Sequence, residues 1–224
     1  KFTILTDSTA AVAEDLAYVS LTGVVKIPSK VKIDGKIYKV TSIGEDAFSG
    51  CEGLTEIVIP SGVNVIANHA FQDCEALSKI VIPSGVTSIE TGVFSGCVNL
   101  KSVSIPSTVI SIGVYAFQNC SSLVAVEIPT SVTTIEDNAF FRCSGLNSIT
   151  IPSSVTKIGK GVFTFCTGLT SINVSPDNAA YSSEDGVLYN ISKTSLIKFP
   201  CNFSGEFTVP SSVTTIEELS FDGC

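Results

Sequence analysis

The chain has 224 residues, of which 44% are hydrophobic and only 15% are charged, and its net charge is −8. Nucleic acids and anionic membrane surfaces are bound through clustered Lys and Arg side chains, so this composition argues against both as partners. No apolar run approaches the roughly 20 residues of a membrane-spanning helix, so direct membrane insertion is not expected. The chain lacks Met, opens at Lys1 and shows no signal peptide, which indicates a mature or excised fragment.

Residues 1–40 lie outside the regular pattern that follows, and we predict a β-rich N-terminal cap there. From residue 41 to about residue 174 one phrase, first seen as "AFSGC" at residues 47–51, returns every 23 residues. A fixed period of this length indicates a solenoid, in which each coil packs only against its neighbours. The repeated positions are Phe48, Phe71, Phe94, Phe117, Phe140 and Phe163, and Cys51, Cys74, Cys97, Cys120, Cys143 and Cys166.

Each repeat contains a strand that ends at a proline. The stretch "LTEIVIP" at residues 54–60 recurs as "LSKIVIP", "LKSVSIP", "LVAVEIP" and "LNSITIP", and its alternation predicts one buried and one outward face. Pro60 marks a corner because it cannot continue a hydrogen-bonded ladder. The following Val and Ile are three residues apart, which favours a bent segment on the far side of the coil. Turn and N-cap residues before the AFxxC phrase predict a short helical or 3₁₀ turn.

Residues 175–207 interrupt the repeat. Two strand-like runs, "GVLY" and "SLIKF", flank a polar link at residues 190–194, which predicts an antiparallel hairpin. A partial final repeat occupies residues 208–224, because the array stops after "SFDGC" and before any strand. A solenoid that ends in mid-unit exposes an apolar edge, so we expect either further repeats or domains beyond Cys224 or another molecule over that end.

The pattern "CxxLxxIxIPxxVxxIxxxAF" resembles the BspA-like leucine-rich repeat family, the 23-residue Treponema-type class of bacterial surface repeats. The resemblance covers nearly the whole chain. It implies a β-rich, right-handed leucine-rich repeat solenoid with a parallel strand ladder, and a location on the cell surface or outside the cell. It also implies two hairpin insertions, the first at Asp34-Gly35 in the opening repeat and the second around "YSSEDGVLYNISKTSLIKFP" at residues 181–200.

The eight cysteines raise the question of disulfides. Equivalent positions in adjacent coils lie about 4.8 Å apart, whereas a disulfide needs Cβ atoms about 3.8 Å apart. We therefore interpret the six repeated cysteines as a structural ladder of buried, reduced thiols. Cys201 and Cys224 lie outside the regular array, and a bridge between them stays open.

No catalytic or metal constellation is evident. His69 is the only histidine and occupies a variable position before Ala70-Phe71, so we interpret it as a tolerated surface residue. No CxxC pair is present for zinc, and acidic pairs such as Glu136-Asp137 are adjacent in sequence at turns, which suits solvated links. We predict no enzyme activity, no metal and no cofactor.

The remaining candidates are surfaces. The outward positions of the strands bear short side chains and lack the Trp, Tyr and Arg that dominate binding hot spots, so this face is either a shallow polar groove for sugar or extended peptide or a solvated sheet. Tyr115, Phe141 and Phe165 form a second candidate, which is either an aromatic anchor patch or packing beneath the insertion. The candidate strand-face residues are Glu56, Val58, Lys79, Val81, Ser102, Ser104, Glu127, Ser148, Thr150 and Asn173.

The family resemblance therefore favours a non-enzymatic secreted or cell-surface module that binds a protein or carbohydrate ligand through the solenoid surface. The alternative is a structural spacer that has no ligand of its own. The two hypotheses differ in whether substitution of outward charged residues changes ligand capture.

Overall fold

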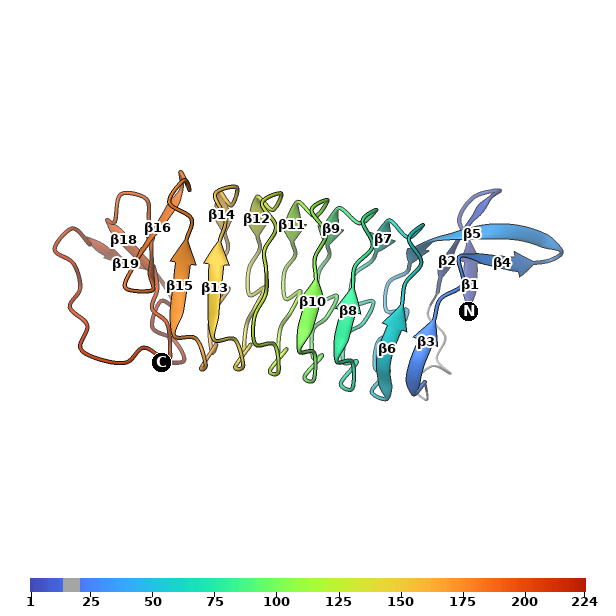
Figure 1. The fold of residues 1–224 in the computed structure, drawn as a ribbon, viewed down its shortest axis with the longest axis horizontal. Helices are drawn as coiled ribbons and strands as arrows, with labels where there is room; N and C mark the ends of the chain where they lie inside the picture. The colour runs from blue at the N-terminus through green and yellow to red at the C-terminus, as the bar shows by residue number, and fades with distance from the viewer. Residues whose placement is uncertain (14–20) are drawn as a thin grey trace.

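Strands of neighbouring coils stack side by side along an elongated rod in the computed structural model, which describes residues 1–13 and 21–224 (Figure 1). One ladder runs along the face that is toward the viewer in Figure 1. It comprises a parallel sheet in the order β10-β8-β6-β3 and a parallel pair, β13 and β15. Their bounds are β3 (Gly23–Lys26), β6 (Leu54–Val58), β8 (Lys79–Val81), β10 (Ser102–Ser104), β13 (Ser148–Ile151) and β15 (Ser171–Val174).

The register of this ladder follows the sequence period. Ser102 of β10 pairs with Lys79 of β8, and Ser148 of β13 pairs with Ser171 of β15, so the partners are one repeat apart. The predicted parallel ladder, with one strand from each coil, is present along most of the rod.

A second parallel ladder lies on the far side of the coils, where the sequence predicted only a bent segment. It consists of strands of two residues each, and its order is β14-β12-β11-β9, with β7 paired to β5. The prediction missed these strands because a run of two residues is too short to show alternation. Their bounds are β7 (Val65–Ile66), β9 (Ser88–Ile89), β11 (Ser111–Ile112), β12 (Thr134–Ile135) and β14 (Lys157–Ile158).

The AFxxC phrase forms successive turns, so the predicted helical or 3₁₀ turn is wrong. Every second N–H from Ala47 to Cys51 donates to a carbonyl three residues earlier, while the N–H groups between them donate to carbonyls of the next coil. Asp46 and Gly50 have φ angles of 52° and 70°. These left-handed residues interrupt the right-handed backbone that a helix needs, and they free alternate N–H groups to join neighbouring coils.

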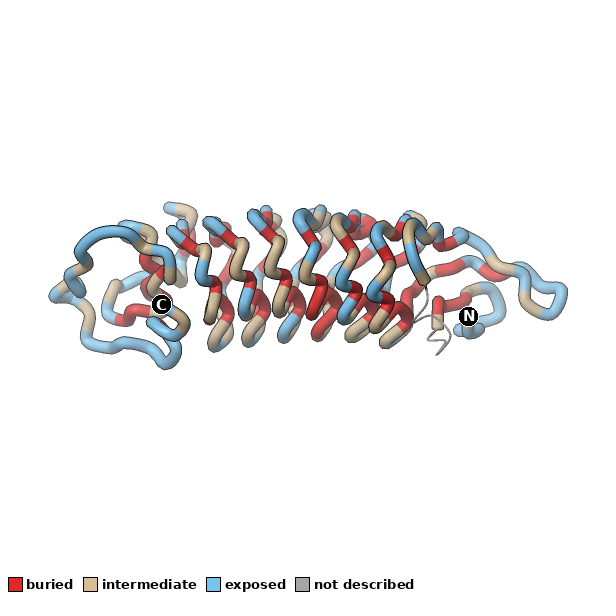
Figure 2. Tube along the Cα trace, turned by 90° about the horizontal axis from the view of Figure 1, so that it is seen from below, coloured by how far each residue is buried: buried red, intermediate tan, exposed pale blue. Residues whose placement is uncertain are grey.

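The core is a continuous apolar column inside the rod, and Figure 2 shows it as the buried segments repeated in each coil. The phenylalanine rings stack along it, with centroids 5.2 to 5.9 Å apart and interplanar angles of 21° or less from Phe48 to Phe163. Offset stacking of this kind is favourable beyond simple area burial. The repeated aromatic residue therefore supplies the same shape to both neighbouring coils.

The N-terminal end holds a separate arrangement of strands in the order β1-β2-β5-β4. The strands are β1 (Phe2–Ile4), β2 (Thr9–Val12), β4 (Lys30–Ile33) and β5 (Lys36–Ile43). β4 and β5 pair antiparallel through a turn at Asp34 and Gly35, whose φ angles are both positive, as a two-residue hairpin turn requires. The hairpin projects beyond the end of the stacked coils (Figure 1).

The C-terminal insertion contains β16 (Tyr181–Glu184), β17 (Val187–Asn190) and β18 (Ser195–Lys198), followed by β19 (Thr215–Ile216) of the last coil. The predicted pairing of "GVLY" with "SLIKF" is present as the antiparallel pair β17 and β18. Sequence reasoning missed β16, which pairs antiparallel with β17. β18 then pairs in parallel with β19, so the last coil continues the stack.

Asn178 anchors the start of the insertion. Its side-chain amide donates to the carbonyls of Pro152 and Val155, at 2.7 and 2.9 Å, and its oxygen accepts the N–H groups of Ala180 and Tyr181, both at 2.8 Å. Asn178 is buried. One side chain thus satisfies four backbone groups at the place where Ser175 replaces the corner proline of the other repeats.

Among residues 1–13 and 21–224, the structure contains no helix whose length and apolar character would let it span a bilayer.

Candidate ligand-binding surface

The structure places the ten candidate strand-face residues on the outer side of the first ladder. Nine are exposed and Glu56 is half-buried. The buried neighbours Ile57, Ile80 and Ile149 alternate with them and point into the core. The face divides into two parts that differ in backbone pairing and in charge.

The part nearer the N-terminus is a complete sheet with a neutralised charge pair. Lys79 Nζ lies 3.4 Å from Glu56 Oε1, and the side chains are 60% and 37% exposed, respectively. An exposed pair of this kind contributes about 0–1 kcal/mol to stability. Val58 and Val81 are exposed beside it, so this part offers a mixed surface with its charges already partnered.

The central part is interrupted. Residues 124–128 form no strand, although "LVAVEIP" carries the alternating pattern, so the prediction of a strand in this coil is wrong. The burial still alternates: Val126 and Ile128 are buried while Ala125 and Glu127 are exposed. Side-chain alternation therefore persists without the backbone pairing that normally accompanies it. In Figure 1 this stretch is drawn without an arrow between β10 and β13.

Hydrogen bonds next to this stretch show where the ladder opens. Lys101 N–H donates to the Ser78 carbonyl at 2.9 Å, and Asn147 N–H donates to the Val124 carbonyl at 3.1 Å. Within the described residues, the equivalent bond from Val124 N–H to the Lys101 carbonyl is missing. β10 and the coil after it are therefore not joined along this face.

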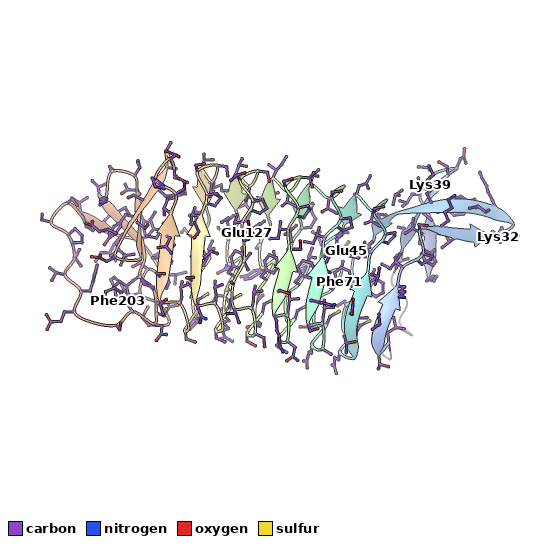
Figure 3. All side chains as sticks on the ribbon, in the orientation of Figure 1. Lys32, Lys39, Glu45, Phe71, Glu127 and Phe203 are labelled. Atoms are coloured by element: carbon purple, nitrogen blue, oxygen red, sulfur yellow. The ribbon has the colours of Figure 1, made fainter. Side chains whose placement is uncertain are left out.

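Two adjoining hollows lie at the interruption, on either side of Glu127 (labelled in Figure 3). Their volumes are about 540 Å³ and 530 Å³. They bring together four of the predicted residues, namely Ser104, Glu127, Ser148 and Thr150, and they share Glu127, Ile128 and Thr130. Sequence reasoning did not place Ser107, Thr130, Ser153 and Ser175 on this surface. They supply further hydroxyl groups at the corners of the coils.

The chemistry of the hollows is one carboxylate surrounded by hydroxyl groups over an apolar floor. None of the described ion pairs involves Glu127, so its oxygens are available as strong acceptors for hydroxyl or amide donors. Ser and Thr hydroxyls can both donate and accept. This combination is suited to binding a polar, hydroxyl- or amide-bearing chain.

The aromatic candidates form a smaller cluster elsewhere. The rings of Phe141 and Phe165 meet edge to face at a centroid distance of 5.6 Å, and the Arg142 guanidinium lies 5.3 and 5.4 Å from them. Sequence reasoning missed Arg142, although it stands beside Phe141. Gly223 of the last coil approaches Phe165 so closely that a Cβ there would lie 2.8 Å from it. Tyr115 is exposed and makes no described ring contact with this cluster.

The repeated cysteines lie inside the core. The Sγ atoms of Cys74, Cys97, Cys120, Cys143 and Cys166 each donate to a phenylalanine carbonyl 26 residues earlier, at 3.0 to 3.2 Å. Burial raises the pKa of Cys97 and of Cys166 to about 12. Cys51 is also fully buried. Outside this ladder, Cys201 and Cys224 are thiols whose Sγ atoms lie 2.9 Å apart.

His69 is more enclosed than the sequence predicted. It is half-buried, has a φ of 55°, and its Nδ1 atom is buried without a hydrogen-bond partner among the described residues. A Cβ at Gly92 would lie 2.3 Å from that atom, so the imidazole packs against the glycine of the next coil. The interpretation as a tolerated surface residue is therefore wrong in part.

Within the part of the chain that the structure describes, no group of three or more His, Cys, Asp or Glu side chains has the geometry of a metal site. Neither hollow contains a histidine or a cysteine.

Comparison with known families agrees with this architecture. The model for the BspA type leucine rich repeat region matches six copies, over residues 29–120 and 87–224. The chain belongs to this family. The predicted resemblance is thereby confirmed. Among curated proteins, no match was found.

Solved structures of similar proteins include bacterial surface proteins. A leucine rich cell surface protein from Faecalibacterium prausnitzii A2-165 is 31% identical, with a TM-score of 0.77, over 100% of this chain and 66% of its own. The pneumococcal vaccine antigen PcpA is 25% identical, with a TM-score of 0.81, over 99% and 59%. A leucine-rich repeat protein from Eubacterium ventriosum ATCC 27560 is 29% identical, with a TM-score of 0.71, over 84% and 52%. The chain thus spans about half to two thirds of these proteins.

Proposed function

We propose that this chain is a non-enzymatic binding module of a bacterial cell surface, and that a protein or carbohydrate ligand lies across the strand face at residues 124–128. The observation that carries the proposal is the interruption of the ladder, which coincides with two adjoining hollows around Glu127. The ligand is an extended, polar chain that presents hydroxyl or amide donors to this carboxylate.

The contrast within one face supports this placement. Glu56 is already paired with Lys79, whereas Glu127 stands between open hollows. A carboxylate that accepts hydrogen bonds from a ligand contributes more than a neutral acceptor does. The surrounding Ser and Thr side chains lose little conformational entropy when a ligand orders them, because they are short.

The location at the cell surface is supported by the relatives. The protein from Faecalibacterium prausnitzii is described as a cell surface protein, and PcpA as a vaccine antigen. A solenoid suits that setting because it presents a long row of equivalent positions, over which weak contacts can add.

The test compares two glutamates of the same ladder. Immobilised neutral glycans and extracellular-matrix proteins are screened with the unmodified chain, and each captured ligand is then titrated with Glu127→Gln and with Glu56→Gln. Loss of a charge-assisted hydrogen bond should weaken binding by about 10- to 100-fold for Glu127→Gln. Glu56→Gln, which removes the same charge from the same face, should change binding less than about twofold.

Equal effects of the two substitutions would contradict the placement at residues 124–128. Failure of the unmodified chain to capture any ligand in the panel would contradict the binding role and favour the alternative, a structural spacer.

A further inference from the structure

The β4–β5 hairpin is a basic element in an acidic protein. Five of the thirteen Lys and Arg residues lie within residues 26–39, which contain a single acidic residue, Asp34, while the whole chain has a net charge of −8. The hairpin extends away from the rod, and its tip is exposed (Figures 1 and 2). Lys32 and Lys39 are labelled on it in Figure 3.

The pairing register places three lysines on one face of the hairpin. Residues opposite each other in an antiparallel pair share a face. Lys30 lies opposite Lys39, and Lys32 lies opposite the exposed Ile37. The other face carries Val31 opposite Tyr38 and Ile33 opposite Lys36. Tyr38 is buried, so that face packs inward at this pair, while Lys36 beside the turn is exposed.

The spacing of these lysines is short. Lys30 and Lys39 are direct cross-strand partners, with Cβ atoms about 4.5–5.5 Å apart, and the diagonal from Lys32 to Lys39 is about 7–8 Å. Lys30 and Lys32 are two residues apart along one strand, a rise of about 7 Å. The attachment points of the three lysine side chains therefore form a compact triangle.

These charges are not neutralised within the described part of the chain. None of the described ion pairs involves Lys30, Lys32 or Lys39, and all three are exposed. Like charges directly opposite each other destabilise a strand pair. The arrangement is unfavourable for folding alone, and an anionic ligand would relieve it.

We infer that the outward face of this hairpin, formed by Lys30, Lys32, Ile37 and Lys39, binds a sulfated linear polysaccharide. Lys is a strongly hydrated point charge without the planar fork of Arg, so it suits dispersed anionic groups along a flexible chain. Nucleic acid recognition in single strands relies on aromatic stacking, and the only aromatic residue of the hairpin, Tyr38, is buried. Electrostatic anchoring to an anionic membrane uses clusters of about four to eight basic residues, more than this face holds.

This site is separate from the hollows around Glu127, and it does not depend on the function proposed for them. Glu127 selects a neutral, hydrogen-bonding ligand, while the hairpin selects negative charge. The two surfaces can therefore be tested independently.

Heparin is the probe for the test. The intact chain is titrated against immobilised heparin from 50 mM to 300 mM NaCl, alongside the triple variant Lys30→Gln, Lys32→Gln, Lys39→Gln. A matched control replaces three exposed lysines of the rod, as Lys101→Gln, Lys157→Gln, Lys160→Gln. The hairpin variant should lose at least ~30-fold in affinity at the lowest salt, and the slope of log K against log salt should fall by about three units.

The control variant should bind heparin within about twofold of the unmodified chain, although its net charge equals that of the hairpin variant. The triple Lys→Arg variant of the hairpin should retain binding, because it keeps the charges. A thermal melt of each variant shows that the chain is folded. Removal of the like-charge pair should leave the hairpin variant at least as stable as the unmodified chain.

Three results would overturn the inference: no binding of heparin by the unmodified chain, equal losses in the hairpin and control variants, or loss of binding in the Lys→Arg variant. Single-stranded DNA and vesicles with anionic lipids form two further arms. Binding of either at least as tightly as heparin would overturn the assignment to a sulfated polysaccharide.

Discussion

The regular coils and the C-terminal insertion provide hydrogen-bond partners for their backbone C=O and N–H groups by different means. In the coils, carbonyl groups of the buried turns accept hydrogen bonds from thiols and from N–H groups of neighbouring repeats, in an arrangement repeated every 23 residues. In the insertion, single side chains do this work. Asn178 satisfies four backbone groups, and the Tyr181 hydroxyl accepts the N–H of Ile158 at 2.8 Å.

Lys198 extends this contrast to the last coil. It is buried, and its ammonium group donates to the carbonyls of Leu219 and Asp222, at 3.2 and 2.9 Å. A buried cation thus adds two hydrogen bonds to carbonyls of the last coil, and the Leu219 carbonyl also accepts the N–H of Asp222. Repetition distributes stability over many equivalent contacts, whereas the insertion concentrates it in a few residues.

The largest expected effect comes from removal of a ring in the middle of the stack. Phe117 is fully buried and stacks on Phe94 and Phe140. Phe117→Ala should lower the free energy of unfolding by about 3–5 kcal/mol, because a cavity opens between two coils. Urea denaturation measures the loss. A loss below about 1 kcal/mol would show that the coils do not depend on shape-matched rings.

A single residue of the insertion should have nearly as large an effect. Asn178→Ala leaves the Val155 carbonyl and two N–H groups without partners, while the Pro152 carbonyl keeps only the N–H of Val155. We expect a loss of about 2–4 kcal/mol in the free energy of unfolding. Asn99→Ala is the matched control, because the exposed Asn99 makes one side-chain bond, to the Glu75 carbonyl. It should cost less than about 1 kcal/mol. Equal losses in the two variants would contradict the view that the insertion, unlike the coils, concentrates stability in single side chains.

The buried thiols should make the free energy of unfolding depend on pH, with a definite sign. Burial raises the pKa of Cys97 to about 12, above the value of about 8.5 in an unfolded chain. The unfolded state therefore loses the thiol proton first as pH rises. The contribution of the protonated, buried thiol to the free energy of unfolding is fully present below about pH 8.5 and is lost as pH rises toward the folded pKa. Between pH 9.5 and 11, the free energy of unfolding should fall less steeply with rising pH in Cys97→Ala than in the unmodified chain. The difference between the two slopes should be about 1.4 kcal/mol per pH unit. An unchanged slope would contradict the buried position of this thiol.

Sequence periodicity predicted the features that every coil shares. Phe117 and Cys97 stand at repeated positions, so their packing could be inferred from spacing alone. The two-residue strands and the alternating turns were missed because no residue pattern within a single repeat indicates the hydrogen bonds between coils. The hydrogen bonds made by the Asn178 and Tyr181 side chains were missed because each occurs once, and a residue that occurs once shows no period.

The surfaces were predictable only in part. Alternation placed Glu127 outward, yet it also predicted a strand at residues 124–128, because apolar spacing reports burial and not backbone pairing. The basic hairpin was hidden by the net charge of the whole chain. Lys30 and Lys39 become a like-charged pair only when the register of β4 and β5 is known.

Amide hydrogen exchange of the unliganded chain tests the interrupted ladder most directly. The account predicts rapid exchange at Ala125 to Ile128 and slow exchange in β13, since only the latter is paired within a sheet. Protection of residues 125–128 equal to that of β13 would show a continuous strand ladder, and it would contradict the opening on which the proposed ligand-binding surface depends.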